Sequence, residues 1–334
     1  MNAGSLFKRV GVVTGVVAGV VGAAYAGERM AVARIRHRSE PDGDADTTVS
    51  FDEARRVECH DGGSLYTLAR GKGSPIVLAH GVTLSSRVWA KQLAALPEFG
   101  FRVVAYDLRG HGESVLGESG HSIDNLASDV RSVVEGLDMR DAVLVGHSMG
   151  GIAVQAFAVR YPEIARTRVR GLVLMSTIAK TFVSDARPLR SAAELIAGRG
   201  PDIGGLMKQP NLGFALARIG FGRDPKAVDV EATRQMLAAC TRETSRAATR
   251  ALLELDLTEG LRELTLPTIV MCGTADVITP PREAHRIADL IPGARLELFP
   301  GAGHMLMYER TEEVDRLIVD FARECVGFPL ESAS

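Results

Sequence analysis

Apolar runs of strand length alternate with longer stretches of helical periodicity from about residue 55 to the end of the chain. Runs of this kind, separated by helices, are typical of a mainly parallel sheet with helices on both faces. The sequence therefore predicts an α/β fold. The predicted strands are Ile76–Ala79, Phe101–Tyr106 and Ala142–Val145, which are expected to be buried, and Leu172–Met175, Ile269–Cys272 and Arg295–Phe299.

A hairpin is expected to precede this alternation. Arg56–Cys59 and Ser64–Ala69 flank Asp61-Gly62-Gly63, which has the composition of a tight turn. Ser122 can cap the helix that follows it, because a serine side chain accepts a hydrogen bond from the first turn. The predicted helices are Val88–Leu96, Ile123–Leu137, Gly150–Tyr161 and Val314–Cys325.

The alternation breaks between residue 180 and about residue 255, where helical patches are separated by Gly204-Gly205 and Pro210. This predicts a helical cap inserted between two strands of the sheet. Most of its apolar residues are expected to form the cap's own small core, since a helical layer must bury one face. The rest could line an apolar substrate pocket. These residues are Leu195, Ile196, Leu206, Met207, Leu212, Phe214, Leu216 and Phe221.

The N-terminal region differs from the rest of the chain. Residues 10–26 carry no charge, and Gly11, Gly15 and Gly19 share one helix face. A transmembrane anchor is the favoured interpretation, and the glycine stripe would allow self-association. A cleaved signal peptide is an alternative, since Lys8-Arg9 precedes the run and Ala24-Tyr25-Ala26 resembles a cleavage site. A third alternative is an amphiphilic arm packed on the domain.

Charges around this segment predict its orientation. Arginines 29, 34, 36 and 38 follow it, whereas only two basic residues precede it. The positive-inside rule then keeps the folded domain in the cytoplasm, and cleavage would instead give a secreted protein. Residues 1–40 are thus expected to form the anchor and the start of a polar linker. The folded domain is expected over residues 50–328, with the cap at about 180–255.

Composition narrows the function classes. The 334 residues are 46% hydrophobic, 24% charged and 5% aromatic, with a net charge of −2. A chain without a basic excess and with few aromatic residues is not expected to bind nucleic acid. The four cysteines are widely spaced, which indicates neither a zinc site nor a disulfide framework. Cys272 lies in an apolar run and is expected to be buried.

The chemistry centres on Gly146-His147-Ser148-Met149-Gly150. A buried strand leads into this Gly-x-Ser-x-Gly motif and a helix follows it, which is the context of a nucleophile elbow. Small residues are needed two positions either side of the serine because the turn is sharp. Ser148 is therefore the predicted nucleophile.

A serine hydroxyl needs a base, and the base needs an orienting acid. His304 follows the last predicted strand on a glycine-rich loop, and Asp276 follows the strand before it. Both lie where parallel strands end, which is where sites of such sheets gather. Asp256 is a weaker candidate for the acid, since an aspartate at a helix end more often caps the helix or is solvated.

Five motifs in order carry a resemblance to α/β-hydrolase-fold serine hydrolases, across roughly residues 55–325. They are His80-Gly81, the segment 107–114 (DLRGHGES), the elbow, Gly273-Thr274-Ala275-Asp276 and Gly303-His304. The resemblance implies an eight-stranded sheet and a Ser148–Asp276–His304 triad. It also implies that the backbone N–H groups of Val82 and Met149 bind the oxyanion, with no metal or cofactor.

Other polar residues are assigned structural roles. Asp107 and His111 are expected to pack and hydrogen-bond within their loop, and His80 to shape the oxyanion loop. His147 is expected to point away from the attack site. A solvated surface is expected for His285 on one helix, and for Asp129 and Glu135 on another.

A serine at the elbow predicts an acyl-enzyme route, unlike the aspartate of related epoxide hydrolases and dehalogenases. The predicted activity is cleavage of carboxylic esters, acyl or lipid-like, and the elbow resembles those of monoacylglycerol lipases and carboxylesterases. Cofactor-free haloperoxidases or perhydrolases and carbon–carbon hydrolases share the triad and stay open as alternatives. A non-catalytic ligand-binding homologue is the alternative from outside the enzymes.

Overall fold

The computed structural model describes residues 49–181 and 203–327. Within these ranges no helix combines the length and the apolar character needed to cross a membrane. The predicted anchor at residues 10–26, with its glycine stripe, lies outside the described residues, as do Leu195 and Ile196 of the cap.

Eight strands form one sheet in the order β1-β2-β4-β3-β5-β6-β7-β8. The first two strands form the predicted hairpin, β2 also runs antiparallel to β4, and every other neighbouring pair is parallel. The eight-stranded, mainly parallel sheet is thus confirmed. The strands are β1 (Glu53–Glu58), β2 (Ser64–Arg70), β3 (Ser74–Ala79), β4 (Phe101–Tyr106), β5 (Ala142–His147), β6 (Val169–Met175), β7 (Thr268–Gly273) and β8 (Arg295–Phe299).

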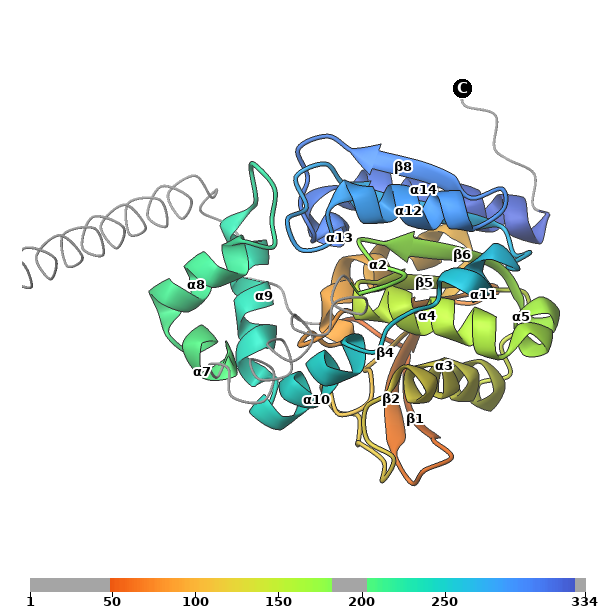
Figure 1. Cartoon of the computed structure of the whole chain (residues 1–334), viewed down its shortest axis with the longest axis horizontal. Helices are drawn as coiled ribbons and strands as arrows, with labels where there is room; N and C mark the ends of the chain where they lie inside the picture. Colours follow the sequence, from red (N-terminus) through yellow and green to blue (C-terminus); the bar gives the residue numbers. More distant parts are fainter. Residues whose placement is uncertain (1–48, 182–202, 328–334) are drawn as a thin grey trace, which may run out of the picture.

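Helices cover both faces of this sheet (Figure 1). Val77, Val104 and Leu144 pack with α3, α4, α11 and α12, whereas their neighbours Ile76 and Val103 pack with α2 and α14 on the other face. Alternate residues of a strand face opposite sides, so strands that are apolar throughout feed both cores. These helices are α2 (Ala90–Ala95), α3 (Ile123–Gly136), α4 (Met149–Arg160), α5 (Pro162–Arg168), α11 (Thr258–Arg262), α12 (Pro281–Leu290), α13 (Leu306–Glu309) and α14 (Thr311–Val326).

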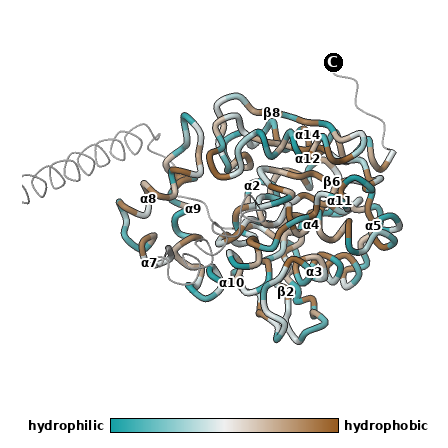
Figure 2. The backbone as a smooth tube through the Cα atoms, viewed as in Figure 1, coloured by the Kyte–Doolittle hydropathy of each residue, from teal (hydrophilic) through white to brown (hydrophobic). Residues whose placement is uncertain are grey.

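Hydropathy follows the same layers. In Figure 2 brown segments concentrate in the central strands and in the helix faces turned toward them, while teal segments mark the outer loops.

The Ser122 hydroxyl caps α3 by accepting from the Asn125 N–H, as predicted. The predicted helix Val88–Leu96 is split between two 3₁₀ turns, Ser86–Trp89 and Leu96–Phe99, with α2 between them.

Among the described residues, five helices lie between β6 and β7, and four of them, α7 to α10, form the cap at one side of the sheet (Figure 1). The two ends of the cap meet beside the sheet, where the Thr181 N–H donates to the Leu255 carbonyl. Of the apolar cap residues, Met207, Phe214 and Phe221 are buried, whereas Leu212 is exposed. The cap helices are α7 (Ile203–Met207), α8 (Pro210–Arg218), α9 (Ala227–Ala239) and α10 (Arg242–Leu252).

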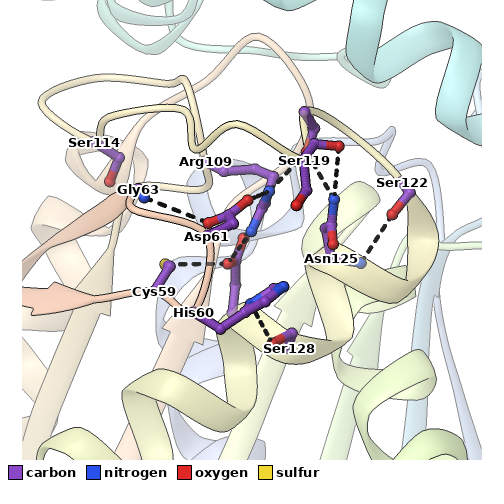
Figure 3. A network of polar contacts seen from close by, with 12 residues as sticks. Cys59, His60, Asp61, Gly63, Arg109, Ser114, Ser119, Ser122, Asn125 and Ser128 are labelled. Atoms are coloured by element: carbon purple, nitrogen blue, oxygen red, sulfur yellow. Dashed lines mark hydrogen bonds and ion pairs between the residues drawn. The ribbon is translucent and has the colours of Figure 1, made fainter.

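The prediction that Asp129 lies on a solvated face is wrong. Both its carboxylate oxygens accept from the Arg109 guanidinium, at 2.6 and 2.7 Å, and both residues are buried. Figure 3 shows Arg109 at the centre of this network, next to Asp61. Arg109 also reaches Asp61 at 3.0 Å and the Gly120 carbonyl at 2.6 Å. The charge is tolerated inside because its partners satisfy it fully. Glu135 on the same helix is exposed, as predicted.

Candidate active site

Ser148 lies between β5 and α4 in a strained backbone conformation, with φ 52° and ψ −117°. Such a conformation costs on the order of 1–3 kcal/mol for a residue other than glycine, and the surrounding structure must impose it. The flanking glycines make the turn possible. A Cβ on Gly146 would lie 2.4 Å from the Gly150 carbonyl oxygen, and a Cβ on Gly150 would lie 2.2 Å from that of Ala79.

Hydrogen bonds hold the elbow from below. The Ser148 N–H donates to the Met175 carbonyl at 3.0 Å, which ties the turn to the end of β6. The Ser148 carbonyl accepts from the Thr177 hydroxyl at 2.7 Å. The side chain is half-buried at the N-terminus of α4. The predicted strand–turn–helix context of the nucleophile is therefore present.

Asp276 and His304 form a buried pair beyond the ends of β7 and β8. His304 Nδ1 lies 2.9 Å from Asp276 Oδ2, and both side chains are almost fully buried. The other carboxylate oxygen accepts from the N–H groups of Ile278 and Thr279, at 2.8 and 2.9 Å. Because a carboxylate only accepts, the proton of the imidazole lies on Nδ1 and leaves Nε2 free to act as a base.

Burial alone would raise the pKa of Asp276, but hydrogen bonding and charge attraction from His304 outweigh it. Hydrogen bonds from Thr279 act in the same direction, so the pKa of Asp276 lies below its ordinary value. The acid is therefore ionised at neutral pH and can stabilise an imidazolium at His304.

The described residues form no hydrogen bond between Ser148 and the His304 ring. Bonds of this kind commonly tighten only when substrate is bound.

His147, which precedes the serine, packs against the His304 ring, and the two ring centroids lie 4.6 Å apart. Its Nε2 donates to the His304 carbonyl at 3.0 Å. Burial, followed by the charge of His304, lowers the pKa of His147 well below its ordinary value, so it stays neutral.

The loop after β3 lies over the serine. A Cβ on Gly81 would come within 3.1 Å of Ser148 Cβ, so the two backbones are in close contact. No hydrogen bond within the described residues uses the Val82 N–H. Met149 is the first residue of α4, where a helix N–H has no partner in its own helix. Both predicted oxyanion donors are therefore available.

Two histidines hold this loop. His80 Nε2 accepts from the Leu108 N–H at 2.9 Å while its Nδ1 faces the Gly81 carbonyl at 2.7 Å. His111 Nε2 accepts from the Thr83 N–H at 3.1 Å while its Nδ1 faces the Arg109 carbonyl at 3.0 Å. Burial lowers the pKa of both imidazoles, to about 3 for His80, so they remain neutral and keep these acceptors. The structural roles predicted for His80 and His111 are confirmed.

The weaker candidates lie elsewhere. Asp256 is exposed, accepts from Thr258 at the start of α11 and pairs with Lys180 at 3.1 Å. His285 is exposed on α12.

Asp107 accepts from the N–H groups of Ser86 and Glu113, at 2.6 and 2.9 Å, which is the structural role expected of it. No group of three metal-ligating side chains occurs within residues 49–181 and 203–327.

A cavity of about 690 Å³ lies between α9 and the loops after β3 and β4. Leu84, Lys91, Met236 and Tyr308 are among the residues that line it, and none of Ser148, Asp276 and His304 does. Leu84 is two residues after Val82, so this cavity lies beside the loop that carries a predicted oxyanion donor. Residues of α9 connect it to the cap.

The comparisons with known proteins agree with this geometry. The model of the alpha/beta hydrolase family matches residues 76–317. The chain belongs to the alpha/beta hydrolase family. A non-heme haloperoxidase of Rhodococcus erythropolis is 31% identical over 271 residues, which cover 79% of this chain and 98% of the relative. A bifunctional esterase/perhydrolase of Acinetobacter calcoaceticus is 29% identical and covers 75% of this chain and 93% of its own.

Solved structures of alpha/beta hydrolases superimpose well. A thermophilic esterase from Thermogutta terrifontis has a TM-score of 0.69 at 29% identity, covering 82% of this chain and 99% of that chain. An esterase from Exiguobacterium antarcticum has a TM-score of 0.71 at 22% identity, covers 81% of this chain and 100% of that chain, and supports the fold alone. As a member of this family with esterase and haloperoxidase homologues, the protein is an enzyme of the hydrolase type.

The site contains supporting residues that the sequence did not single out. Thr279 donates its hydroxyl to Asp276 Oδ2 at 2.8 Å, and Thr177 holds the elbow. The contact of His147 with the His304 carbonyl was not foreseen either. The available signal was their place near strand ends: His147 ends β5, Thr177 follows β6, and Thr279 lies in the loop after β7. The ends of parallel strands meet at one edge of the sheet.

Proposed function

We propose that the protein is a serine hydrolase that cleaves carboxylic esters through an acyl-enzyme intermediate. The observation that carries the proposal is the buried Asp276–His304 pair, 2.9 Å apart, at the same sheet edge as the strained elbow of Ser148. This is the arrangement that an activated serine needs: a base for the hydroxyl proton, and an acid that fixes the tautomer of the base.

In acylation, Ser148 Oγ attacks the ester carbonyl carbon and its proton passes to His304 Nε2. The resulting oxyanion accepts hydrogen bonds from the N–H groups of Val82 and Met149. The intermediate then collapses, the carbon–oxygen bond to the alcohol breaks, and His304 returns the proton to the departing oxygen. Loss of one oxyanion donor costs on the order of 3 kcal/mol in such sites.

In deacylation, His304 takes a proton from water as the water attacks the acyl carbonyl. The second tetrahedral intermediate uses the same two N–H groups. Its collapse releases the carboxylic acid and restores the Ser148 hydroxyl, with the proton returned from His304. No step requires a metal or an organic cofactor. The acyl group is proposed to be apolar, because the cap next to the site is rich in apolar residues.

Perhydrolysis is a second candidate, favoured by the activities of the relatives, which include a bifunctional esterase/perhydrolase and a non-heme haloperoxidase. It needs the same acyl-enzyme. Hydrogen peroxide replaces water as the acyl acceptor, and the product is a peracid in place of the acid. Only the partition of the acyl-enzyme between water and peroxide separates the two activities.

A fluorophosphonate probe tests the proposal directly, because it phosphonylates only a serine with an active base. The full chain should be labelled, and Ser148→Ala should abolish labelling, while Ser128→Ala on α3 should label like the wild type. A screen of p-nitrophenyl esters of increasing acyl length, with and without peroxide, then defines the acyl group and the acceptor. Absence of labelling in the wild type, beside a labelled reference hydrolase, would leave a non-catalytic binding protein.

A further inference from the structure

A single carboxylate joins the cap to the loop that carries His304. Glu309, at the end of the one-turn helix α13, accepts from the Gly303 N–H with Oε1 at 2.9 Å and from the Gly222 N–H with Oε2 at 2.7 Å. Gly303 is the neighbour of His304 in the chain, whereas Gly222 belongs to the turn between α8 and α9 of the cap. The carboxylate therefore bridges two backbone segments about 80 residues apart.

The same two segments are joined by backbone hydrogen bonds. The His304 N–H donates to the Gly220 carbonyl at 2.8 Å, and the Arg223 N–H donates to the Gly301 carbonyl at 3.0 Å. We call this group of contacts between residues 220–223 and 301–304, together with Glu309, the cap clasp. It fixes the backbone of His304 against the cap.

The close approach depends on glycine. A Cβ on Gly222 would lie 2.1 Å from the Gly301 carbonyl oxygen, and a Cβ on Gly303 would lie 2.4 Å from the Gly222 nitrogen. The backbones of Gly222 and Gly303 thus contact each other without side chains between them, and the N–H group of each donates to Glu309. Only an acceptor with two oxygens in the right plane can satisfy both donors, and an ionised carboxylate is such an acceptor.

We propose that Glu309 is a positioning residue for the reaction: it holds the His304 loop to the cap, so that the orientation of the base depends on the seating of the cap. The proposal rests on the proposed function for the role of His304. Glu309 touches none of the reacting atoms and acts through Gly303. Displacement of a catalytic group by about 1 Å can lower a rate by about a hundredfold, so a loosened clasp should be visible in kcat.

Glu309→Gln is the first test, because the amide keeps the shape but presents one acceptor and one donor to two N–H groups. We expect kcat for a short p-nitrophenyl ester to fall about tenfold to a hundredfold, with KM changed less than twofold. Glu309→Asp keeps both oxygens and should recover part of the loss. The matched control is Glu313→Gln, an exposed carboxylate on the next helix, which should leave both constants unchanged.

Gly222→Ala breaks the clasp from the cap side and gives an independent test if Glu309→Gln folds poorly. Because both changes open the same contact, the double variant should lose little more activity than either single variant. Multiplicative losses in the double variant, or a normal kcat in folded Glu309→Gln protein, would overturn the proposal.

Hydrogen–deuterium exchange separates this inference from the proposed function. Peptides covering residues 219–224 and 300–306 should exchange faster in Glu309→Gln and Glu309→Asp than in the wild type, with peptides of β5 unchanged. This readout needs no turnover. Faster exchange supports the clasp even if the ester assay fails. Unchanged exchange in both segments contradicts it even in an active esterase.

Discussion

At the scale of single residues, the site depends on fixed tautomers. Asp276 fixes the proton of His304 on Nδ1, and backbone carbonyls do the same for His80 and His111. In each case the other ring nitrogen is left as an acceptor. One such acceptor is the proposed base, and the other two hold the oxyanion loop through the N–H groups of Leu108 and Thr83.

Asp276→Asn should lower kcat for ester hydrolysis by about 10³- to 10⁴-fold, with a much smaller change in KM. The amide that replaces the carboxylate can donate to Nδ1, which moves the proton to Nε2 and removes the base. Steady-state kinetics with a short p-nitrophenyl ester measures this. Asp256→Asn is the matched control and should stay near wild type. An equal loss of kcat in Asp256→Asn would contradict the assignment of Asp276 as the acid of the triad.

His111→Ala should lower kcat by about tenfold to a hundredfold, because Thr83, which has φ 64°, loses the acceptor that holds its N–H. The adjacent Val82 N–H then loses its fixed direction. Kinetics of the variant beside His285→Ala, an exposed histidine, gives the comparison. Full activity of His111→Ala in a folded protein would show that the loop holds its shape without this bond.

At the scale of elements, sequence and structure can be compared directly. The bounds of β4 and β8 coincide with the predicted runs Phe101–Tyr106 and Arg295–Phe299, because turn residues delimit each run. The burial of Asp129 was missed, although it lies three residues after Leu126 and four before Val133 on the buried face of α3. Its partner Arg109 is on a distant loop, and periodicity carries no information about such a partner.

The same limit applies to the site. Ser148, Asp276 and His304 could be predicted because a motif or a strand end marks each of them. The amides bound by Glu309 lie 6 and 87 residues away, so no local pattern could reveal its role. What sequence patterns miss is contact between loops that the chain brings together only after the sheet has formed.

Arg109→Met should lower the free energy of unfolding by about 3–5 kcal/mol, since it leaves the buried carboxylates of Asp129 and Asp61 without their cation. Arg160→Met is the control, because its ion pair with Asp124 joins the same helix α3 but is exposed. That change should cost less than about 1 kcal/mol. Urea unfolding measures both. Equal effects of the two substitutions would contradict a special role for the buried network.

Asp315 on α14 makes stability depend on pH. Burial raises its pKa to about 6, although Gln92 on α2 donates to it at 2.8 Å. The folded state therefore binds the proton more tightly than the unfolded state, whose aspartate titrates near 4. The free energy of unfolding should fall as pH rises from about 4 to 6, by at most about 3 kcal/mol, and stay lower above that range.

Asp315→Asn should remove this dependence and stabilise the protein at pH 7.5 by about 1–3 kcal/mol, with little effect at pH 4. The amide can still accept from Gln92 and has a donor for Gln92 Oε1, which lacks a partner among the described residues. Urea unfolding at four or five pH values measures the slope. Asp320→Asn on the same helix serves as the control, and parallel pH profiles of Asp315→Asn and wild type would refute the assignment.

At the scale of the whole molecule, the catalytic domain and the N-terminal region are expected to be separable. The first described contacts of the domain come just after residue 48: Val49 packs against the core, and Asp52 accepts from the Gly71 N–H at 2.9 Å. We propose that residues 10–26 attach the protein to a membrane, with self-association through Gly11, Gly15 and Gly19 and with the enzyme domain on the cytoplasmic side. Secretion after cleavage of this segment is the competing proposal.

Deletion of residues 1–40 keeps every described contact and should leave the unfolding temperature and kcat/KM for soluble esters nearly unchanged. The same deletion should abolish sedimentation with lipid vesicles, because it removes the uncharged run of residues 10–26 that is proposed to attach the protein to the membrane. Full-length protein with Gly15→Leu tests the glycine stripe: it should still bind vesicles but self-associate less by crosslinking. Vesicle binding by the truncated protein would instead locate the membrane contact on the catalytic domain, and loss of folding on truncation would show that the N-terminal region is part of it.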